Sequence, residues 1–421
     1  MDPITLPVAE DACCPEFADL SRRSLLRGAL ALGGATFMVG GATVSASAAS
    51  PSPASAVLVV LSLRGGADGM SLVVPHGDAG YYHARPTIGI AASQLLVPDT
   101  QFGLHPNLAP LLPLWNAGQL AAVHATGLTV ANRSHFSAME EVEEAHPGST
   151  KRIGWLNRLV GAASSRHNPL QGVGIGGGTP PTELSGPLPL MTLSDLQNAS
   201  IAGDDGSKKS PRRKSLHAMW DHDHSPMGVA VRSTMKAIDD LKPAQAETNA
   251  QDYGSSALGA ALATAARIIQ GDVGVEVITV DQGDWDMHVN LGGLDGGEML
   301  GNASDLATSL AAFFGDLGDQ ADKVTLVTIS EFGRRTQENG DRGLDHGWGN
   351  VMFVAGAGVD GGAYYCQEWK PLANDLESDL HVTTDYRNVL REVVHARFAA
   401  ANTSQVFPGL KPHTLGFMQA T

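Results

Sequence analysis

Cysteine is nearly absent from this sequence, and its absence excludes one way of stabilising a fold. Among 421 residues there are three cysteines: Cys13 and Cys14 are neighbours near the amino terminus, and Cys366 is alone in the rest of the chain. A single cysteine cannot form an internal disulfide. We therefore expect a fold that depends on its hydrophobic core, for which an apolar content of 43% is ample.

Positive charge is also scarce. Lysine and arginine number 28 against 44 aspartates and glutamates, which gives a formal net charge of −16. An acidic chain repels a phosphate backbone, so we expect no nucleic-acid partner, and we interpret the basic run at 208–214 as a solvated loop. Aromatic residues make up only 5%, whereas glycine is plentiful at 49. This composition suits an α/β protein with close packing and many loops.

Long hydrophobic runs are missing as well. The apolar stretch at 28–44 is interrupted by glycines and is shorter than the roughly 20 residues that a membrane span needs. It follows the twin arginine of "SRRSLL" (21–26) and precedes "ASA" (46–48), an order typical of a twin-arginine export signal. We predict an export signal at 1–48 and a single domain at 49–421. The mature protein would be periplasmic, cell-wall or extracellular, with no stable membrane span after signal cleavage.

Short apolar runs alternate with helical patterns along the rest of the chain. Strands ending in loops are predicted at 56–63, 120–127, 274–283 and 323–333, with a fifth at 350–359. Helical patterns begin near Pro106, Ser134, Ser256 and Asn302. This alternation predicts an α/β fold with a doubly wound, mostly parallel sheet and helices on both faces. Residues 168–189 are predicted to be a surface loop, and residues near 204–228 a polar insertion.

Acidic residues and histidines gather where the predicted strands end. Ligands of doubly wound sheets collect at the carboxyl ends of the strands. Because several loops must converge to hold a cation, we interpret the pattern as a metal site. The candidates are Asp68 after the first strand, Ser134 and His135 after the second, Asp284, Asp286 and His288 after the third, Glu331 after the fourth, and Asp345 and His346 before the fifth.

Several candidates also have an ordinary structural explanation. Ser134 precedes a helical pattern and suits an N-cap. Asp68 in "GGADGM" suits a turn. Glu331 is spaced to pair with Arg334 or Arg335 if the segment is helical. The acidic loop "DQGDWDMH" (281–288) is open to either interpretation when it is taken alone.

Two further motifs combine aspartate and histidine. In "LDHGWG" (344–349), glycines beside Asp345 and His346 would let the backbone approach a ligand closely. The motif "DHDH" (221–224) lies in the predicted insertion and away from the strand ends, so it is the weaker candidate.

Seven motifs, in order along the chain, resemble the uncharacterised secreted bacterial family known as domain of unknown function 1501. They are "LRGGADGMSLVVP", "NRSHFSAME", "GDWDMH", "TISEFGRR", "DHGWGNVMFVAG", "VTTDYRNVLREV" and "VFPG". That family resembles a branch of the alkaline phosphatase and sulfatase superfamily, whose members hydrolyse phosphate or sulfate esters at a two-metal site. The resemblance implies one or two divalent ions, with zinc, calcium, magnesium and manganese all open. It also implies a small-molecule or polymer-borne anionic ester as substrate.

The resemblance implies roles for single residues. Ser134 falls at the position of the nucleophile, and His135 is the second catalytic candidate. The implied metal ligands are Asp68, Asp286, His288, Glu331, Asp345 and His346. Phe332 lies where the superfamily has a ligand histidine, and Asp345 is its candidate replacement. The family's usual third motif is G-G-W-D-T-H, so Asp284 replaces a glycine.

Two functions from different classes follow. The leading hypothesis is an exported metal-dependent hydrolase of phosphate or sulfate esters, with Ser134 as nucleophile. The alternative is a catalytically inactive extracellular binding module that retains the superfamily fold and a structural metal, and Phe332 favours it. A third and weaker hypothesis is an ion-pair network across the strand ends with no metal at all.

Overall fold

The structure is a computed structural model that describes residues 37–39, 42–44, 52–163, 168–176, 180–188, 190–207, 210–373, 375 and 377–419. The predicted export signal at 1–48 lies outside these residues, except for the two short strands β1 (Phe37–Val39) and β2 (Ala42–Val44). Among the described helices, none combines the length and the apolar character needed to cross a membrane.

One large sheet organises the described part of the chain. Its strands lie in the order β1-β2-β8-β7-β9-β3-β10-β11-β6-β12, and β13 also pairs with β6. The strands are β3 (Val57–Leu63), β6 (Leu120–Gly127), β7 (Gly172–Ile175), β8 (Met191–Leu193), β9 (Val277–Gln282), β10 (Val324–Ile329), β11 (Asn350–Gly356), β12 (Ala363–Tyr365) and β13 (Thr384–Asp385). A separate small sheet pairs β4 (Val73–Val74) with β5 (Gly103–Leu104).

The central strands run parallel. β8, β7, β9, β3 and β10 pair in parallel, in that order across the sheet. β11 is antiparallel to both of its neighbours, β10 and β6. The amino end of β11 therefore lies at the same edge of the sheet as the carboxyl ends of β10 and β6. The predicted α/β fold with a mostly parallel sheet is confirmed.

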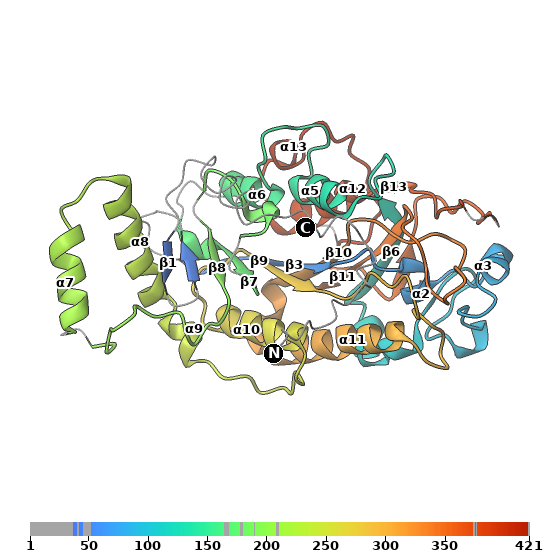
Figure 1. Cartoon of the computed structure of the whole chain (residues 1–421), viewed down its shortest axis with the longest axis horizontal. Coiled ribbons are helices and arrows are strands. Elements are labelled where there is room, and N and C mark those ends of the chain that lie inside the picture. Colours follow the sequence, from blue (N-terminus) through green and yellow to red (C-terminus); the bar gives the residue numbers. More distant parts are fainter. Residues whose placement is uncertain are drawn as a thin grey trace, which may run out of the picture. The chain divides into compact units, whose positions relative to one another are not determined.

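Helices cover both faces of the sheet, with α5, α6, α12 and α13 on one side and α10 and α11 on the other (Figure 1). Alternate side chains of β3 enter two separate cores, because successive side chains of a strand point to opposite faces. Val57, Val59 and Leu61 belong to the core beneath α10 and α11, whereas Leu58 and Val60 belong to the other.

The helices predicted from sequence near residues 106, 134, 256 and 302 are present. The α-helices beside and between the strands are α2 (Gly69–Leu72), α3 (Ala79–Ala84), α4 (Leu112–Asn116), α5 (His135–Glu144), α6 (Trp155–Ala163), α9 (Lys242–Ala246), α10 (Ala257–Gln270), α11 (Glu298–Asp316), α12 (Tyr386–Arg397) and α13 (Thr403–Val406). Short 3-10 helices are η2 (Ala92–Gln94), η3 (Pro106–Leu111), η4 (Pro169–Gln171), η5 (Thr182–Leu184) and η6 (Gly318–Lys323).

The prediction of a surface loop at 168–189 is wrong. This segment contains β7, an interior strand between β8 and β9 whose four residues are all buried. The glycines of β7, Gly172 and Gly174, reflect crowding and not a turn. A Cβ on Gly172 would lie 2.8 Å from the Leu190 side chain, and a Cβ on Gly174 would lie 2.9 Å from the Thr192 side chain.

The polar insertion predicted near 204–228 contains helix α7 (Pro211–Trp220) and the start of α8 (Pro226–Asp240). Both helices begin with a serine N-cap followed by proline, a combination that favours helix initiation. None of the residues of α7 is buried, which agrees with the polar composition of this segment.

Candidate metal centre

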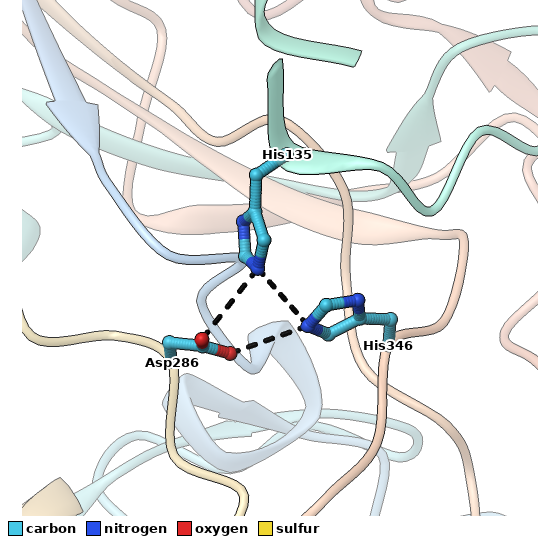
Figure 2. A group of neighbouring side chains, drawn as sticks. All are labelled: His135, Asp286 and His346. Carbon is cyan, nitrogen blue, oxygen red and sulfur yellow. Dashed lines mark hydrogen bonds and ion pairs between the residues drawn. The ribbon is translucent and has the colours of Figure 1, made fainter. Parts of the chain in front are cut away.

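Two histidines and an aspartate from three separate segments meet at the strand-end edge of the sheet (Figure 2). His135 is the first residue of α5, Asp286 follows β9, and His346 precedes β11. One ligand atom of each residue lies within 4.8 Å of the other two. His135 Nε2 is 3.0 Å from His346 Nε2 and 3.6 Å from Asp286 Oδ2. His346 Nε2 is 3.3 Å from Asp286 Oδ1.

His288 adds a third imidazole. Its Nε2 atom lies 2.9 Å from His346 Nε2 and 3.1 Å from Asp286 Oδ1. The residue between Asp286 and His288 is Met287, which is buried in the core. Because alternate residues of an extended segment point in opposite directions, burial of Met287 turns both of its neighbours toward the same group. We call His135, Asp286, His288 and His346 the metal group.

The other ring nitrogen of each histidine faces an acceptor. A carbonyl oxygen or an ionised carboxylate can only accept, so each Nδ1 atom carries the hydrogen of the neutral ring. In the neutral ring each Nε2 atom keeps its lone pair and directs it into the metal group. Without a metal ion, a proton on Nε2 would instead be donated to Asp286. The Nδ1 contacts are His135 to Glu331 Oε1 at 2.9 Å, His346 to the Arg133 carbonyl at 3.0 Å, and His288 to Asp345 Oδ1 at 3.1 Å.

This donor set fits a metal ion. His346 Nε2 lies 3.0 Å from His135 Nε2 and 2.9 Å from His288 Nε2. Lone pairs on nitrogen atoms this close repel one another unless a cation lies among them. Imidazole nitrogens with a carboxylate oxygen are the ligands of zinc and similar transition metals. Metal-binding histidines also typically donate their second N–H to a carboxylate or a carbonyl, which fixes the tautomer and the ring orientation. All three histidines of the metal group have such an acceptor.

Glu331 lies behind His135. Its Oε1 atom also accepts from the Gly65 backbone N–H at 2.9 Å, and its Oε2 atom lies 3.1 Å from Ser330 Oγ, a hydroxyl that is closer to the Leu63 carbonyl at 2.7 Å. Burial opposes ionisation of this carboxyl, but hydrogen bonds from His135 and Gly65 hold its pKa below the usual range. The Oε1 atom of Glu331 is thus occupied by two protein donors. Glu331 therefore contacts the Nδ1 atom of His135 and orients that ring. Asp345 contacts the Nδ1 atom of His288 in the same way.

The metal group attracts positive charge. Burial opposes the charge of Asp286, but hydrogen bonds from the three histidines and from Arg334 hold its pKa well below the usual range. Burial lowers the pKa of His135, yet the carboxylates of Asp286 and Glu331 outweigh it and raise that pKa to about 9. A proton or a metal ion is therefore strongly stabilised among these side chains.

Phe332 packs directly against the metal group. Its ring centroid lies 4.9 Å from that of His135 and 4.8 Å from that of His346, and the side chain is buried. At the position where the superfamily resemblance implies a ligand histidine, this chain therefore has a buried apolar side chain. Asp345, the predicted replacement, contacts the ring of His288 on the side away from Asp286.

Ser134 occupies the N-cap position of α5, immediately before His135. Its side chain makes no capping hydrogen bond, although serine at this position usually does. The backbone N–H of Ser134 donates to Asn132 Oδ1 at 3.2 Å. The amides of the first turn of α5 are therefore not capped by the Ser134 hydroxyl, which lies one residue from the metal group.

Asp68 is not part of the metal group. Its carboxylate forms a two-pronged ion pair with Arg85, with Oδ2 2.5 Å from Nη1 and Oδ1 2.9 Å from Nη2. Both side chains are buried. Burial opposes ionisation of Asp68, but the Arg85 guanidinium lowers its pKa. Asp284 is also outside the group, with an exposed side chain and a positive φ of 64°.

Sequence reasoning missed Arg85 and assigned Arg334 the wrong partner. Arg85 is 17 residues from Asp68, a spacing that no local pattern connects. The expected pairing of Glu331 with Arg334 or Arg335 is wrong, because the segment after β10 is not helical. Arg334 instead donates to Asp286 Oδ1 at 2.6 Å, across 48 residues of sequence.

Comparison with family models agrees with the sequence motifs. A family model described as "Protein of unknown function (DUF1501)" matches residues 55–394, a span that includes every candidate residue. Among solved structures, the chain is similar to the lipoteichoic acid synthase LtaP from Listeria monocytogenes at 10% identity and a TM-score of 0.32. That match covers 79% of this chain and 72% of that chain. No curated protein matches the sequence.

Proposed function

The chain belongs to the DUF1501 family of proteins of unknown function, and we propose that it is an exported metal-dependent hydrolase of phosphate or sulfate esters. One observation carries the proposal. Three histidine Nε2 atoms and the Asp286 carboxylate converge, and every Nδ1 atom is held by an acceptor. The proposed substrate is an anionic ester, either a small molecule or part of a polymer.

The donor set narrows the choice of metal. Three nitrogen donors and one carboxylate favour zinc or a similar transition metal over calcium and magnesium, which prefer oxygen ligands. When bound, such an ion would polarise the ester and neutralise the charge that develops on the transferring group.

The protein's own residues would place the nucleophile and bind the anion. We assign the nucleophilic role to Ser134, because it adjoins His135 and its hydroxyl does not cap α5. The amino-terminal end of α5 carries the partial positive charge of the helix dipole, which favours a phosphate or sulfate group at that end of the helix. Glu331 fixes the orientation of the His135 ring through its hydrogen bond to Nδ1. Ser134 is the preceding residue, so the ring and the hydroxyl lie at the same end of α5.

A matched pair of serine variants tests this assignment. Ser134→Ala should abolish ester hydrolysis while leaving the fold and the bound metal unchanged, because it removes only the attacking hydroxyl. Ser137→Ala, an exposed serine one turn further along α5, is the control and should keep activity. The measurements are turnover of a phosphate and sulfate ester panel with added zinc, manganese, magnesium or calcium, and metal content by plasma mass spectrometry. Full turnover in Ser134→Ala would remove serine from the mechanism.

A second function is favoured by one specific contact. Phe332 covers one side of His135 and His346 with an apolar ring. This arrangement suits an extracellular binding module that keeps a structural metal but performs no hydrolysis. The same ester panel separates the two functions, since a binding module would retain its metal and hydrolyse no ester with any of the four ions.

A further inference from the structure

Two buried arginines reach the strand-end edge of the sheet beside the metal group. Arg85 follows α3, and Arg334 lies in the segment after β10. Their side chains are both 0% exposed. Because a guanidinium stays protonated in proteins, each contributes a full positive charge to this edge.

Arg85 has an acceptor for every donor. Two N–H groups bind the two oxygens of Asp68, one contacts Ser71 Oγ at 3.3 Å, and two bind the carbonyls of Thr336 at 3.0 Å and Arg335 at 3.1 Å. A guanidinium has five N–H groups, so its capacity is fully used. Moving Arg85 away would leave buried acceptors without partners, which is unfavourable.

The charge of Asp68 is therefore already compensated. A divalent ion bound by this carboxylate would lie within a few ångströms of the guanidinium. Repulsion between the two cations would be strong, because a buried site has a low effective dielectric constant. Arg85 cannot relieve that repulsion by losing its proton.

Arg334 brings a second fixed charge next to Asp286. Besides the Asp286 contact, it donates to the carbonyls of Gly66 at 2.5 Å, Leu344 at 3.0 Å and Trp285 at 3.1 Å. It thus ties the loop after β3 to the loop after β9. The Oδ1 atom that it contacts also faces two histidines of the metal group.

The remaining positions that a second ion would need are also engaged. Glu331 Oε1 accepts from His135 and Gly65, and Glu331 Oε2 faces the Ser330 hydroxyl at 3.1 Å. Position 332 is a buried phenylalanine with no ligand atom. Of the acids near the strand ends, only Asp286 lies in the metal group.

We propose that the centre holds a single divalent ion, bound by His135, Asp286, His288 and His346, and that Arg85 supplies at Asp68 the charge that a second ion would otherwise supply. Asp68 then orders the loop after β3 and is not a ligand. This inference rests on the metal site of the proposed function and concerns its stoichiometry. It departs from the two-metal site that the superfamily resemblance implies.

Two aspartate-to-asparagine variants test this inference. Each replaces a carboxylate by a neutral amide of similar shape, Asp286→Asn at a proposed metal ligand and Asp68→Asn at the partner of Arg85. The full chain, Asp68→Asn and Asp286→Asn are loaded with excess zinc and freed of unbound metal by gel filtration. Zinc per chain is then measured by plasma mass spectrometry, and the Tm is measured with and without chelator. We expect one equivalent in the parent, one in Asp68→Asn, and well below one in Asp286→Asn.

The Tm values give a second readout. Loss of the Arg85 partner should lower the Tm of Asp68→Asn equally with and without chelator, since that ion pair does not involve the metal. Two equivalents in the parent, or loss of zinc in Asp68→Asn, would overturn the single-ion inference and leave the metal site standing. No zinc in the parent would overturn the proposed function as well. If Asp68→Asn does not fold, the parent stoichiometry decides alone.

Discussion

At the scale of single residues, Asp284 has an unusual backbone conformation. Its φ is 64°, in the left-handed region that glycine adopts freely and other residues adopt at a cost. The family motif has glycine at this position, and the conformation explains why. The Asp284 side chain is exposed and outside the metal group, so its carboxylate is not needed to hold the loop that carries Asp286.

Replacing Asp284 should therefore affect stability and not metal binding. We expect Asp284→Gly to raise the free energy of unfolding by about 0.5–1 kcal/mol, because it relieves the left-handed strain. Asp284→Val, a β-branched control, should lower it by about 1–2 kcal/mol. Urea unfolding of the zinc-free proteins measures both effects. If Asp284→Gly lost bound zinc instead, Asp284 would be a ligand after all.

At the scale of elements, the segment between β10 and β11 is positioned by glycines packed against other backbone. A Cβ on Gly343 would lie 1.9 Å from the His288 carbonyl oxygen, and a Cβ on Gly347 would lie 2.2 Å from the Arg334 carbonyl carbon. The glycines of "LDHGWG" were expected to let the backbone approach a ligand, and that stays a prediction. Gly347 of this motif, with Gly343 before it, lets the segment pack against its neighbours, which brings His346 to the metal group.

A pair of alanine substitutions within this segment tests that role. Gly347→Ala should lower the free energy of unfolding by about 1–3 kcal/mol, because the added methyl collides with backbone that cannot rotate away. It should also reduce zinc binding, since His346 is the preceding residue. Gly340→Ala is the control, because a Cβ there would meet nothing within 4 Å. Thermal unfolding and zinc content are the measurements, and equal behaviour of the two variants would contradict the packing explanation.

The direction of β11 also decides whether His346 can reach the metal group. His346 precedes its strand, whereas Asp286 follows β9 and Glu331 follows β10. In a fully parallel sheet, a residue before a strand would lie at the opposite edge. Because β11 runs antiparallel to β10, its amino end meets the carboxyl ends of the other strands.

At the scale of the whole molecule, two buried histidines make stability depend on pH. Burial lowers the pKa of His124 to about 4, despite a hydrogen bond to the Val73 carbonyl, and burial lowers the pKa of His105 to about 4 as well. His124 Nδ1 accepts from the Ala125 N–H at 2.9 Å, and its ring stacks on Phe102. The folded protein therefore keeps this imidazole neutral.

The sign of the pH effect follows from which state binds the proton. An unfolded histidine protonates near pH 6.5, whereas these two protonate in the fold only near pH 4. Between those values the unfolded chain binds more protons, so stability falls as the pH is lowered through this window. Each histidine should contribute at most about 1.4 kcal/mol per pH unit.

His124→Gln should reduce the slope of the free energy of unfolding against pH, because one of the two histidines no longer takes up a proton on unfolding. The variant should also be less stable at pH 7. His222→Gln, at an exposed histidine, should leave the slope unchanged. Chelated protein is used in all cases so that the metal group does not contribute through bound zinc. Urea unfolding between pH 7 and pH 4.5 is the measurement, and an unchanged slope in His124→Gln would contradict the assignment.

The sequence by itself determined the fold class, the family and most of the metal group. Periodic apolar runs specified strands and helices, because burial of one face or of a whole strand needs that pattern. Acids and histidines after those runs then had to lie along one edge, and Asp286 and His288 do. His346 precedes its strand and reaches that edge because β11 is antiparallel to β10. The prediction at β7 was wrong because a glycine-rich segment is typical of a loop. The glycines of β7 instead make room for neighbouring side chains in the buried sheet.

The tertiary structure alone decided which candidate has which role. Asp68 follows a strand, as Asp286 does, but its carboxylate forms an ion pair with Arg85. His135, a catalytic candidate by sequence, contributes its Nε2 to the metal group, while Glu331 and Asp345 hold the far nitrogens of histidines. Local sequence patterns follow from chain geometry over a few residues. Ion pairs and ligand sets instead depend on atoms brought together across tens or hundreds of residues, so only the packed fold specifies them.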